Sequence, residues 1–266
     1  WLCPLRAFVP GVGTGLAIFD GITWRNWPPV ALKKGDIMRS FDPSRFTVAK
    51  SRPLPVFLLL DVSGSMAGSK IATLNQAAKE MLGAFVKEDE NQSQIQISIV
   101  TFGGEARLRV PLTPASQIEW TELTADGGTP MGAAITMAKG MLEDKEATPS
   151  RAYRPTVILI SDGQPTDDWQ EPVRSFVSGG RSAKCDRMAM AIGSDADEAV
   201  LSEFIKGTPH ELFHAENASQ IHEFFKRVTM SVTVRSRSTS PNDVPAEAVV
   251  GPAGATGPTE SSTSRS

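Results

Sequence analysis

Apolar runs alternate with amphipathic stretches between residues 54 and 233. The runs at 56–60 and 156–160 are continuous and rich in branched side chains, as in strands buried on both faces. Residues 95–102 begin with alternating isoleucines and then become wholly apolar, which also indicates a strand. Between these runs, apolar residues recur every three or four positions, the spacing of a helix that buries one face. Strands alternating with helices predict an α/β fold with a doubly wound, mostly parallel central sheet flanked by helices.

Two capping patterns mark the starts of the later helices. Asp195 and Glu198 have the spacing of a capping box for a helix that ends near residue 205. Asn217 and Gln220 have the same spacing at the start of the last helix. The other expected elements are helices at 71–85, 131–142 and 169–177 and strands at 105–112, 187–192 and 212–213.

Composition divides the chain into three parts. Residues 1–53 are rich in Pro, Gly and Trp, lack periodicity, and form an N-terminal extension without an assigned function. Residues 54–233 carry the α/β pattern and form the folded domain. Residues 234–266 have no aromatic side chain and are rich in Ser, Thr, Pro, Gly and Ala, so a disordered tail is expected. Arg235 and Arg237 would then be solvated linker charges.

The charge and cysteine content narrow the functional classes. The net charge of −3 and the isoelectric point near 5.7 give no basic character that would attract nucleic acid. No apolar run reaches the roughly 18 residues of a membrane span. Cys3 and Cys185 form neither a disulfide framework nor a C-x-x-C metal knuckle. Since residues 7–22 make a poor signal peptide, we expect a cytoplasmic protein, with secretion left open.

Three polar segments are the candidates for chemistry. A D-x-S-x-S string directly follows the strand at 56–60, and an Asp-Gly pair follows the strand at 156–160. Between them, Gly-Gly-Thr-Pro allows a tight turn just before a helix. Because ligands bind at the carboxyl ends of parallel strands, we expect the three segments to converge at one edge of the sheet. The oxygen-bearing residues are Asp61, Ser63, Ser65, Thr129 and Asp162.

These side chains suit a hard divalent cation, Mg²⁺ or alternatively Mn²⁺ or Ca²⁺. Hydroxyls are neutral ligands, so an ion held directly by one aspartate keeps uncompensated positive charge. It would attract a carboxylate of a protein partner, which favours partner binding over catalysis. The simpler alternative is that Ser63 and Ser65 cap the following helix and Asp162 begins a turn.

Residues 54–233 resemble the von Willebrand factor A (vWA) domain with its metal-ion-dependent adhesion site, and the domain has a Rossmann-like fold. The resemblance implies that Ser63, Ser65 and Thr129 offer hydroxyls to the metal and that Asp61 and Asp162 reach it directly or through water. Within the family, the sequence is most similar to bacterial tellurium-resistance-associated vWA proteins of the TerY type. That resemblance implies a stress-response or defence module containing a phosphatase and a protein kinase as partners. The segments that carry it are FLLLDVSGSM (57–66), LTADGGTPMG (123–132) and YRPTVILISDGQPTDD (153–168).

Two metal-dependent hydrolases are the alternative functions. Residues 210–214 read H-E-L-F-H and fit the H-E-x-x-H zinc-peptidase string, which requires a helix. Pro209 before the string and the cap at Asn217 after it favour a strand instead. Asp61 could also serve as the phosphoryl acceptor of an aspartyl phosphatase. Such an enzyme would need a second Asp two positions on, where this chain has Ser63.

Overall fold

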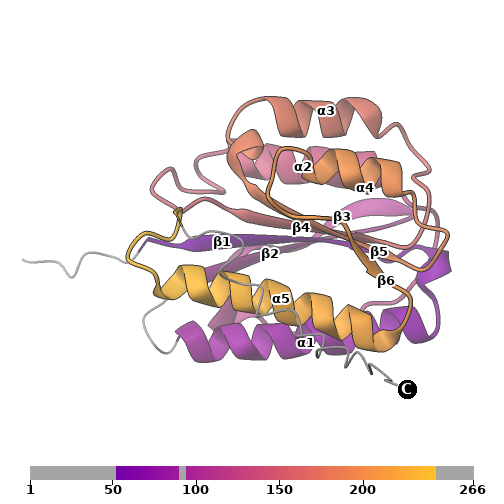
Figure 1. Ribbon diagram of the computed structural model, residues 1–266, viewed down its shortest axis with the longest axis horizontal. Helices are drawn as coiled ribbons and strands as arrows, with labels where there is room; N and C mark the ends of the chain where they lie inside the picture. The colour runs from indigo at the N-terminus through magenta and orange to yellow at the C-terminus, as the bar shows by residue number, and fades with distance from the viewer. Residues whose placement is uncertain (1–51, 90–93, 244–266) are drawn as a thin grey trace, which may run out of the picture. The chain divides into compact units, whose positions relative to one another are not determined.

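A single six-stranded sheet forms the centre of the protein. The computed structural model describes residues 52–89 and 94–243. The strand order is β3-β2-β1-β4-β5-β6, and only the edge strand β3 is antiparallel to its neighbour (Figure 1). This arrangement confirms the predicted mostly parallel α/β sheet. The strands are β1 (Leu54–Asp61), β2 (Ile95–Gly103), β3 (Glu105–Pro114), β4 (Thr156–Ser161), β5 (Asp186–Ile192) and β6 (Phe213–Ala215).

Helices cover both faces of the sheet. Two of them, α1 and α5, lie side by side on one face, and the other three lie on the opposite face (Figure 1). No helix in the described residues is long and apolar enough to cross a membrane. The helices are α1 (Ser69–Asp89), α2 (Met131–Glu143), α3 (Gln170–Ser178), α4 (Glu198–Ile205) and α5 (Ala218–Arg237).

The two layers explain the unbroken apolar run of β1. Leu58 and Leu60 belong to the hydrophobic cluster that contains the buried residues of α1 and α5. Phe57 and Leu59 point the other way, into the cluster formed with α2, α3 and α4. Because each face has its own core, every residue of this strand is buried. The same holds for β4, the other strand that leads into a polar candidate segment.

The structure confirms one predicted helix cap and corrects the other. The Asn217 side chain accepts a hydrogen bond from the Gln220 backbone N–H at 3.1 Å, as expected at the start of α5. At α4 the cap is Asp197, whose carboxylate accepts from the Ala199 N–H at 3.0 Å. The predicted cap at Asp195 is therefore wrong, because that residue lies two positions further from the helix.

The last helix continues past the boundary expected at residue 233. Arg235 is 3% exposed, and its guanidinium donates to the Thr156 hydroxyl at 2.5 Å, the Arg154 carbonyl at 2.6 Å and the Pro241 carbonyl at 3.0 Å. Arg237 donates to the Glu88 carboxylate. The expectation of a solvated linker charge is therefore wrong for Arg235, whereas the Arg237 side chain stays 64% exposed. The helix continues to Arg237, so the fold extends past residue 233. The rest of the predicted tail and residues 1–51 lie outside the described residues.

We expect Arg235→Met to destabilise the protein, because the substitution leaves buried acceptors near the start of β4 without their donor. The free energy of unfolding should fall by roughly 3 kcal/mol in urea titrations. Arg174→Met is the matched control, since Arg174 is exposed on α3 and pairs only with Glu171 in the described residues. It should change stability by no more than about 0.5 kcal/mol. Equal effects of the two variants would contradict a structural role for Arg235.

Candidate metal centre

Backbone hydrogen bonds hold the three polar segments together at the carboxyl ends of β1 and β4, on the right in Figure 1. The Gly64 N–H donates to the Gly127 carbonyl at 2.9 Å, which joins the first segment to the second. The Thr166 N–H donates to the Thr129 carbonyl at 2.9 Å, which joins the third segment to the second. The predicted convergence is therefore confirmed for the backbone.

Glycine is required where the second segment meets the loop after β2. Gly127 has φ +74°, in the left-handed region. A Cβ on Gly127 would lie 2.5 Å from the backbone of Gly104, closer than real contacts allow. A larger residue would therefore push the loop carrying Thr129 away from the sheet edge.

Two carboxylates are buried in this cluster. Asp61 is fully buried, and its oxygens accept from the Ser63 N–H at 2.8 Å and the Ser161 hydroxyl at 2.5 Å. Asp162 is 1% exposed, and its Oδ1 accepts from the Ser65 hydroxyl at 2.7 Å. The hydroxyl oxygens of Ser63 and Ser65 are themselves 3.0 Å apart. Hydrogen bonds therefore link four of the five predicted site residues into one connected network.

The fifth predicted residue, Thr129, approaches this cluster beside Gly163. A Cβ on Gly163 would lie 3.5 Å from the Ser65 Oγ and 3.7 Å from the Thr129 Oγ1. The missing side chain leaves open the place where these two hydroxyls converge. The Thr129 residue is only 4% exposed, yet within the described residues its hydroxyl makes no hydrogen bond. The structure thus brings all five residues together and leaves one hydroxyl available to a ligand.

Burial dominates the electrostatics of Asp61. Loss of solvent raises the pKa of this carboxyl above its ordinary value of 3.8, and the nearby charge of Asp162 raises the pKa further. Hydrogen bonds from Ser161 and Ser63 oppose the shift without cancelling it. An ionised Asp61 is therefore costly in the metal-free protein, and a bound cation would offset that cost.

The donor set fits a hard cation. Its atoms are carboxylate and hydroxyl oxygens, the ligands that Mg²⁺, Mn²⁺ and Ca²⁺ take. Nowhere in residues 52–89 and 94–243 do three or more His, Cys, Asp or Glu side chains gather as a metal site. A softer ion held by several nitrogen or sulfur ligands thus has no ready-made site in this part of the chain.

Three nearby residues were not anticipated from the sequence. Ser161 bonds Asp61 from the neighbouring strand, and Lys70 forms an ion pair with Asp162. Asp167 accepts hydrogen bonds from two backbone N–H groups in the first turn of α2, those of Gly132 and Ala133, at 3.0 and 2.8 Å. Because Asp167 belongs to the third segment, these bonds tie the start of α2 to that loop. Each role depends on a partner that is distant in sequence, so no local pattern reveals it.

The H-E-x-x-H string does not form a zinc-peptidase helix. Its last two residues lie in β6 (Phe213–Ala215), one position later than the strand predicted at 212–213. His210 hydrogen-bonds Asp186 at 2.8 Å, whereas His214 lies 3.5 Å from Glu198. The two histidines therefore have different partners, and the segment lacks the helix that would place both on one metal ion.

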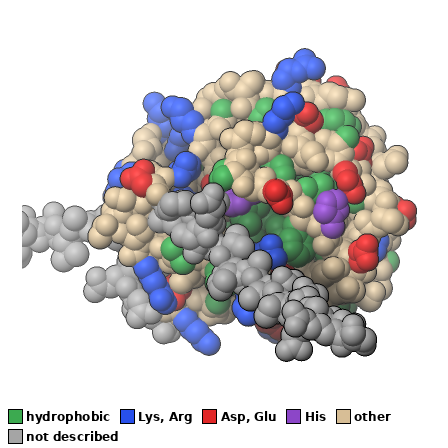
Figure 2. Space-filling view, in the orientation of Figure 1, with side chains coloured by type: hydrophobic (Ala, Val, Ile, Leu, Met, Phe, Trp, Pro, Cys, Tyr) green, Lys and Arg blue, Asp and Glu red, His purple; other side chains and the backbone are tan. Residues whose placement is uncertain are grey.

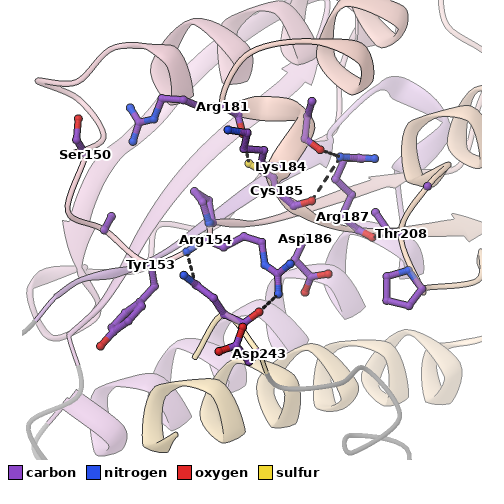
Figure 3. Close-up of a pocket in the computed structure, with 16 residues that line it drawn as sticks. Ser150, Tyr153, Arg154, Arg181, Lys184, Cys185, Asp186, Arg187, Thr208 and Asp243 are labelled. Atoms are coloured by element: carbon purple, nitrogen blue, oxygen red, sulfur yellow. Dashed lines mark hydrogen bonds between the residues drawn. The ribbon is translucent and has the colours of Figure 1, made fainter. Parts of the chain in front are cut away.

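A cavity of about 660 Å³ lies at the opposite end of the sheet, where β4 and β5 begin (Figure 3). Figure 2 shows Lys and Arg side chains gathered at that end of the visible face. The cavity lining includes Arg187, which is 2% exposed and donates to the carbonyls of Phe204 and Lys206 at 2.7 and 2.8 Å. These bonds attach β5 to the end of α4, which is a structural role. Size alone therefore does not make this cavity the functional site.

A model of the von Willebrand factor type A domain matches residues 56–227, which is more than half of the chain. The chain belongs to this family. vWA domains are protein-interaction modules that often depend on a metal ion. The match includes all three polar segments of the candidate metal centre.

The sequence relatives of this vWA chain include inter-alpha-trypsin inhibitor heavy chain H4 from mammals. The Sus scrofa protein is 28% identical over 218 residues, and the Homo sapiens protein is 27% identical over 220 residues. Each match covers 75% of this chain but only 22% of the relative. The chain thus spans about a fifth of the length of these relatives.

Solved structures share the fold. A von Willebrand factor type A protein from Catenulispora acidiphila has a TM-score of 0.54 at 19% identity, covering 69% of this chain and 43% of that one. Proximal thread matrix protein 1 of the mussel byssus, described with a zinc-occupied MIDAS motif, has a TM-score of 0.53 at 15% identity. That match covers 70% of this chain and 46% of the mussel protein. At these identities the likeness establishes the fold alone.

We expect Asp61→Asn to stabilise the vWA domain in EDTA, because asparagine keeps the shape without the buried charge. At neutral pH the free energy of unfolding should rise by about 1 kcal/mol. The folded-state pKa of Asp61 is raised, so the wild type loses stability as pH increases through that pKa. The gap between variant and wild type should therefore open above pH 3.8 and close below it. Urea titrations at several pH values below and above 3.8 measure this difference in the free energy of unfolding. A difference that did not change with pH would contradict the raised pKa of Asp61.

Proposed function

We propose that this vWA domain binds a divalent cation and uses it to hold a carboxylate of a protein partner. The observation that supports the proposal is the convergence of three distant segments, with two buried carboxylates and three hydroxyls, at one edge of the sheet. The residues proposed to hold the ion are Asp61, Ser63, Ser65, Thr129 and Asp162.

The roles of the side chains follow from their surroundings. Thr129 offers an uncommitted hydroxyl, and Ser65 shares with it the open place beside Gly163. Both oxygens of Asp61 already accept hydrogen bonds in the protein, and so do both oxygens of Asp162, so either carboxylate is suited to act through a metal-bound water. The cation supplies a positive centre with exchangeable water ligands, and an Asp or Glu of the partner would replace one of them. No step turns over a substrate in this proposal.

Mg²⁺ is the cation proposed for the cell, with Mn²⁺ and Ca²⁺ as alternatives. Few protein carboxylates and several neutral oxygens suit Mg²⁺, which retains waters readily. Ca²⁺ usually takes more protein oxygens than this site offers.

The biological setting remains a prediction. The resemblance to tellurium-resistance proteins favours a cytoplasmic stress or defence module in bacteria, with a kinase and a phosphatase as partners. The relatives found by sequence are mammalian, so they give this bacterial setting no support. Neighbouring genes that encode a kinase and a phosphatase would support the module, and genes for a pilus or a secretion system would contradict it.

We expect Asp61→Asn to weaken Mg²⁺ binding at least about 30-fold in titration calorimetry, because the variant lacks one of the two buried charges. The matched control is Asp144→Asn, which removes an exposed carboxylate at the far end of α2 and should bind Mg²⁺ as the wild type does. Both variants should keep the circular dichroism spectrum of the wild type. An unchanged Mg²⁺ affinity of Asp61→Asn would show that the ion lies elsewhere.

A further inference from the structure

Lys70 places a positive charge directly on the candidate metal centre. Its ammonium donates to the Oδ2 of Asp162 at 2.5 Å, while Ser65 occupies the other oxygen of the same carboxylate. The Asp162 side chain is fully buried and the Lys70 side chain is 34% exposed. The Lys70 ammonium also lies 3.8 Å from the place of a Cβ on Gly193, so the side chain reaches across to the loop after β5.

The helix that carries Lys70 gives no reason for this position. Lys70 is the second residue of α1, and cations are unfavourable at a helix N-terminus because the helix dipole is positive there. The first turn of α1 contains no acidic residue that would compensate. The contact with Asp162, 92 residues away, is therefore the interaction that holds the ammonium in place.

The formal charges at the site indicate a role for Lys70. Asp61 and Asp162 are the two buried carboxylates at this edge of the sheet in the described residues. By themselves they would neutralise a divalent cation, and the loaded site would have no net charge with which to attract a third carboxylate. With Lys70 present, the loaded site keeps one positive charge, which matches one Asp or Glu of a partner.

We propose that Lys70 weakens the binding of the cation and strengthens the binding of a partner carboxylate to the metal-loaded site. The repulsion between the ammonium and the cation lowers the affinity for the metal. The remaining positive charge raises the affinity for an anion. The inference rests on the proposed metal-dependent function. It identifies Lys70 as the residue that sets the balance between the affinity for the metal and the affinity for the carboxylate.

The test measures both affinities with Mn²⁺ as the metal and acetate as the carboxylate. Electron paramagnetic resonance of free Mn²⁺ gives the metal affinity, and relaxation of the acetate methyl protons by the bound Mn²⁺ gives the acetate affinity. Lys70→Met should bind Mn²⁺ about tenfold more tightly and, at equal metal occupancy, acetate about tenfold more weakly. Lys70→Arg keeps the charge and should resemble the wild type. Lys79→Met removes an exposed lysine from the same helix and should change neither affinity.

Opposite changes in the two affinities distinguish this role from a structural one. If Lys70 only supported the fold, Lys70→Met would weaken both, and that result would overturn the inference. Unchanged affinities would also overturn it. If neither the wild type nor Lys70→Met bound Mn²⁺, the proposed metal-dependent function itself would fail, and the role of Lys70 with it.

Discussion

The parallel pairing of β1 with β4 is the constraint on which the site depends. The register places Leu60 opposite Ile160, so Asp61 comes beside Ser161 and Asp162 follows immediately. The hydrogen bond between Ser161 and Asp61 requires this alignment. A slip by one residue would turn each side chain of a strand to the other face of the sheet and separate the two carboxylates from their partners. Because both faces of both strands are apolar, the hydrophobic pattern alone does not fix this register. The close packing of side chains in the two cores must fix it instead.

The two buried carboxylates of the candidate metal centre lower the stability of the domain. Two carboxylates buried within one cluster repel each other and lose solvation, and the raised pKa of Asp61 expresses this cost. Hydrogen bonds from serines offset part of the cost, and Lys70 neutralises one of the two charges. A divalent cation would offset the remainder, so metal binding and folding are linked. This uncompensated cost favours ion binding, since a cation would gain less at a cluster whose charges were already balanced.

The local patterns of the sequence predicted the sheet and the convergence of the polar segments, because buried strands and strand-end loops leave clear signatures. They failed where a side chain acts over long range. Arg235 looks like a linker charge until α5 brings it beside Thr156. The Asp195–Glu198 spacing fits a capping box, but spacing alone does not fix the first residue of a helix, and Asp197 is the cap. Lys70 lies between the D-x-S-x-S segment and the helix predicted at 71–85, and its partner Asp162 is 92 residues away, so only the folded structure shows the contact.

Two short motifs in this chain show when a sequence string can support a function. H-E-x-x-H places its metal ligands within five residues, so its ability to bind zinc depends entirely on a local helix. The strand at Phe213–Ala215 rules that helix out. D-x-S-x-S is equally short, but the proposed site also needs Thr129 and Asp162, which come from distant parts of the chain. The fold brings both residues to the site. The hydroxyls of Thr129 and Ser65 both lie near Gly163, and Asp162 accepts a hydrogen bond from Ser65. Agreement between distant segments is hard to obtain by chance, and for that reason the metal centre is a stronger hypothesis than either motif alone could provide.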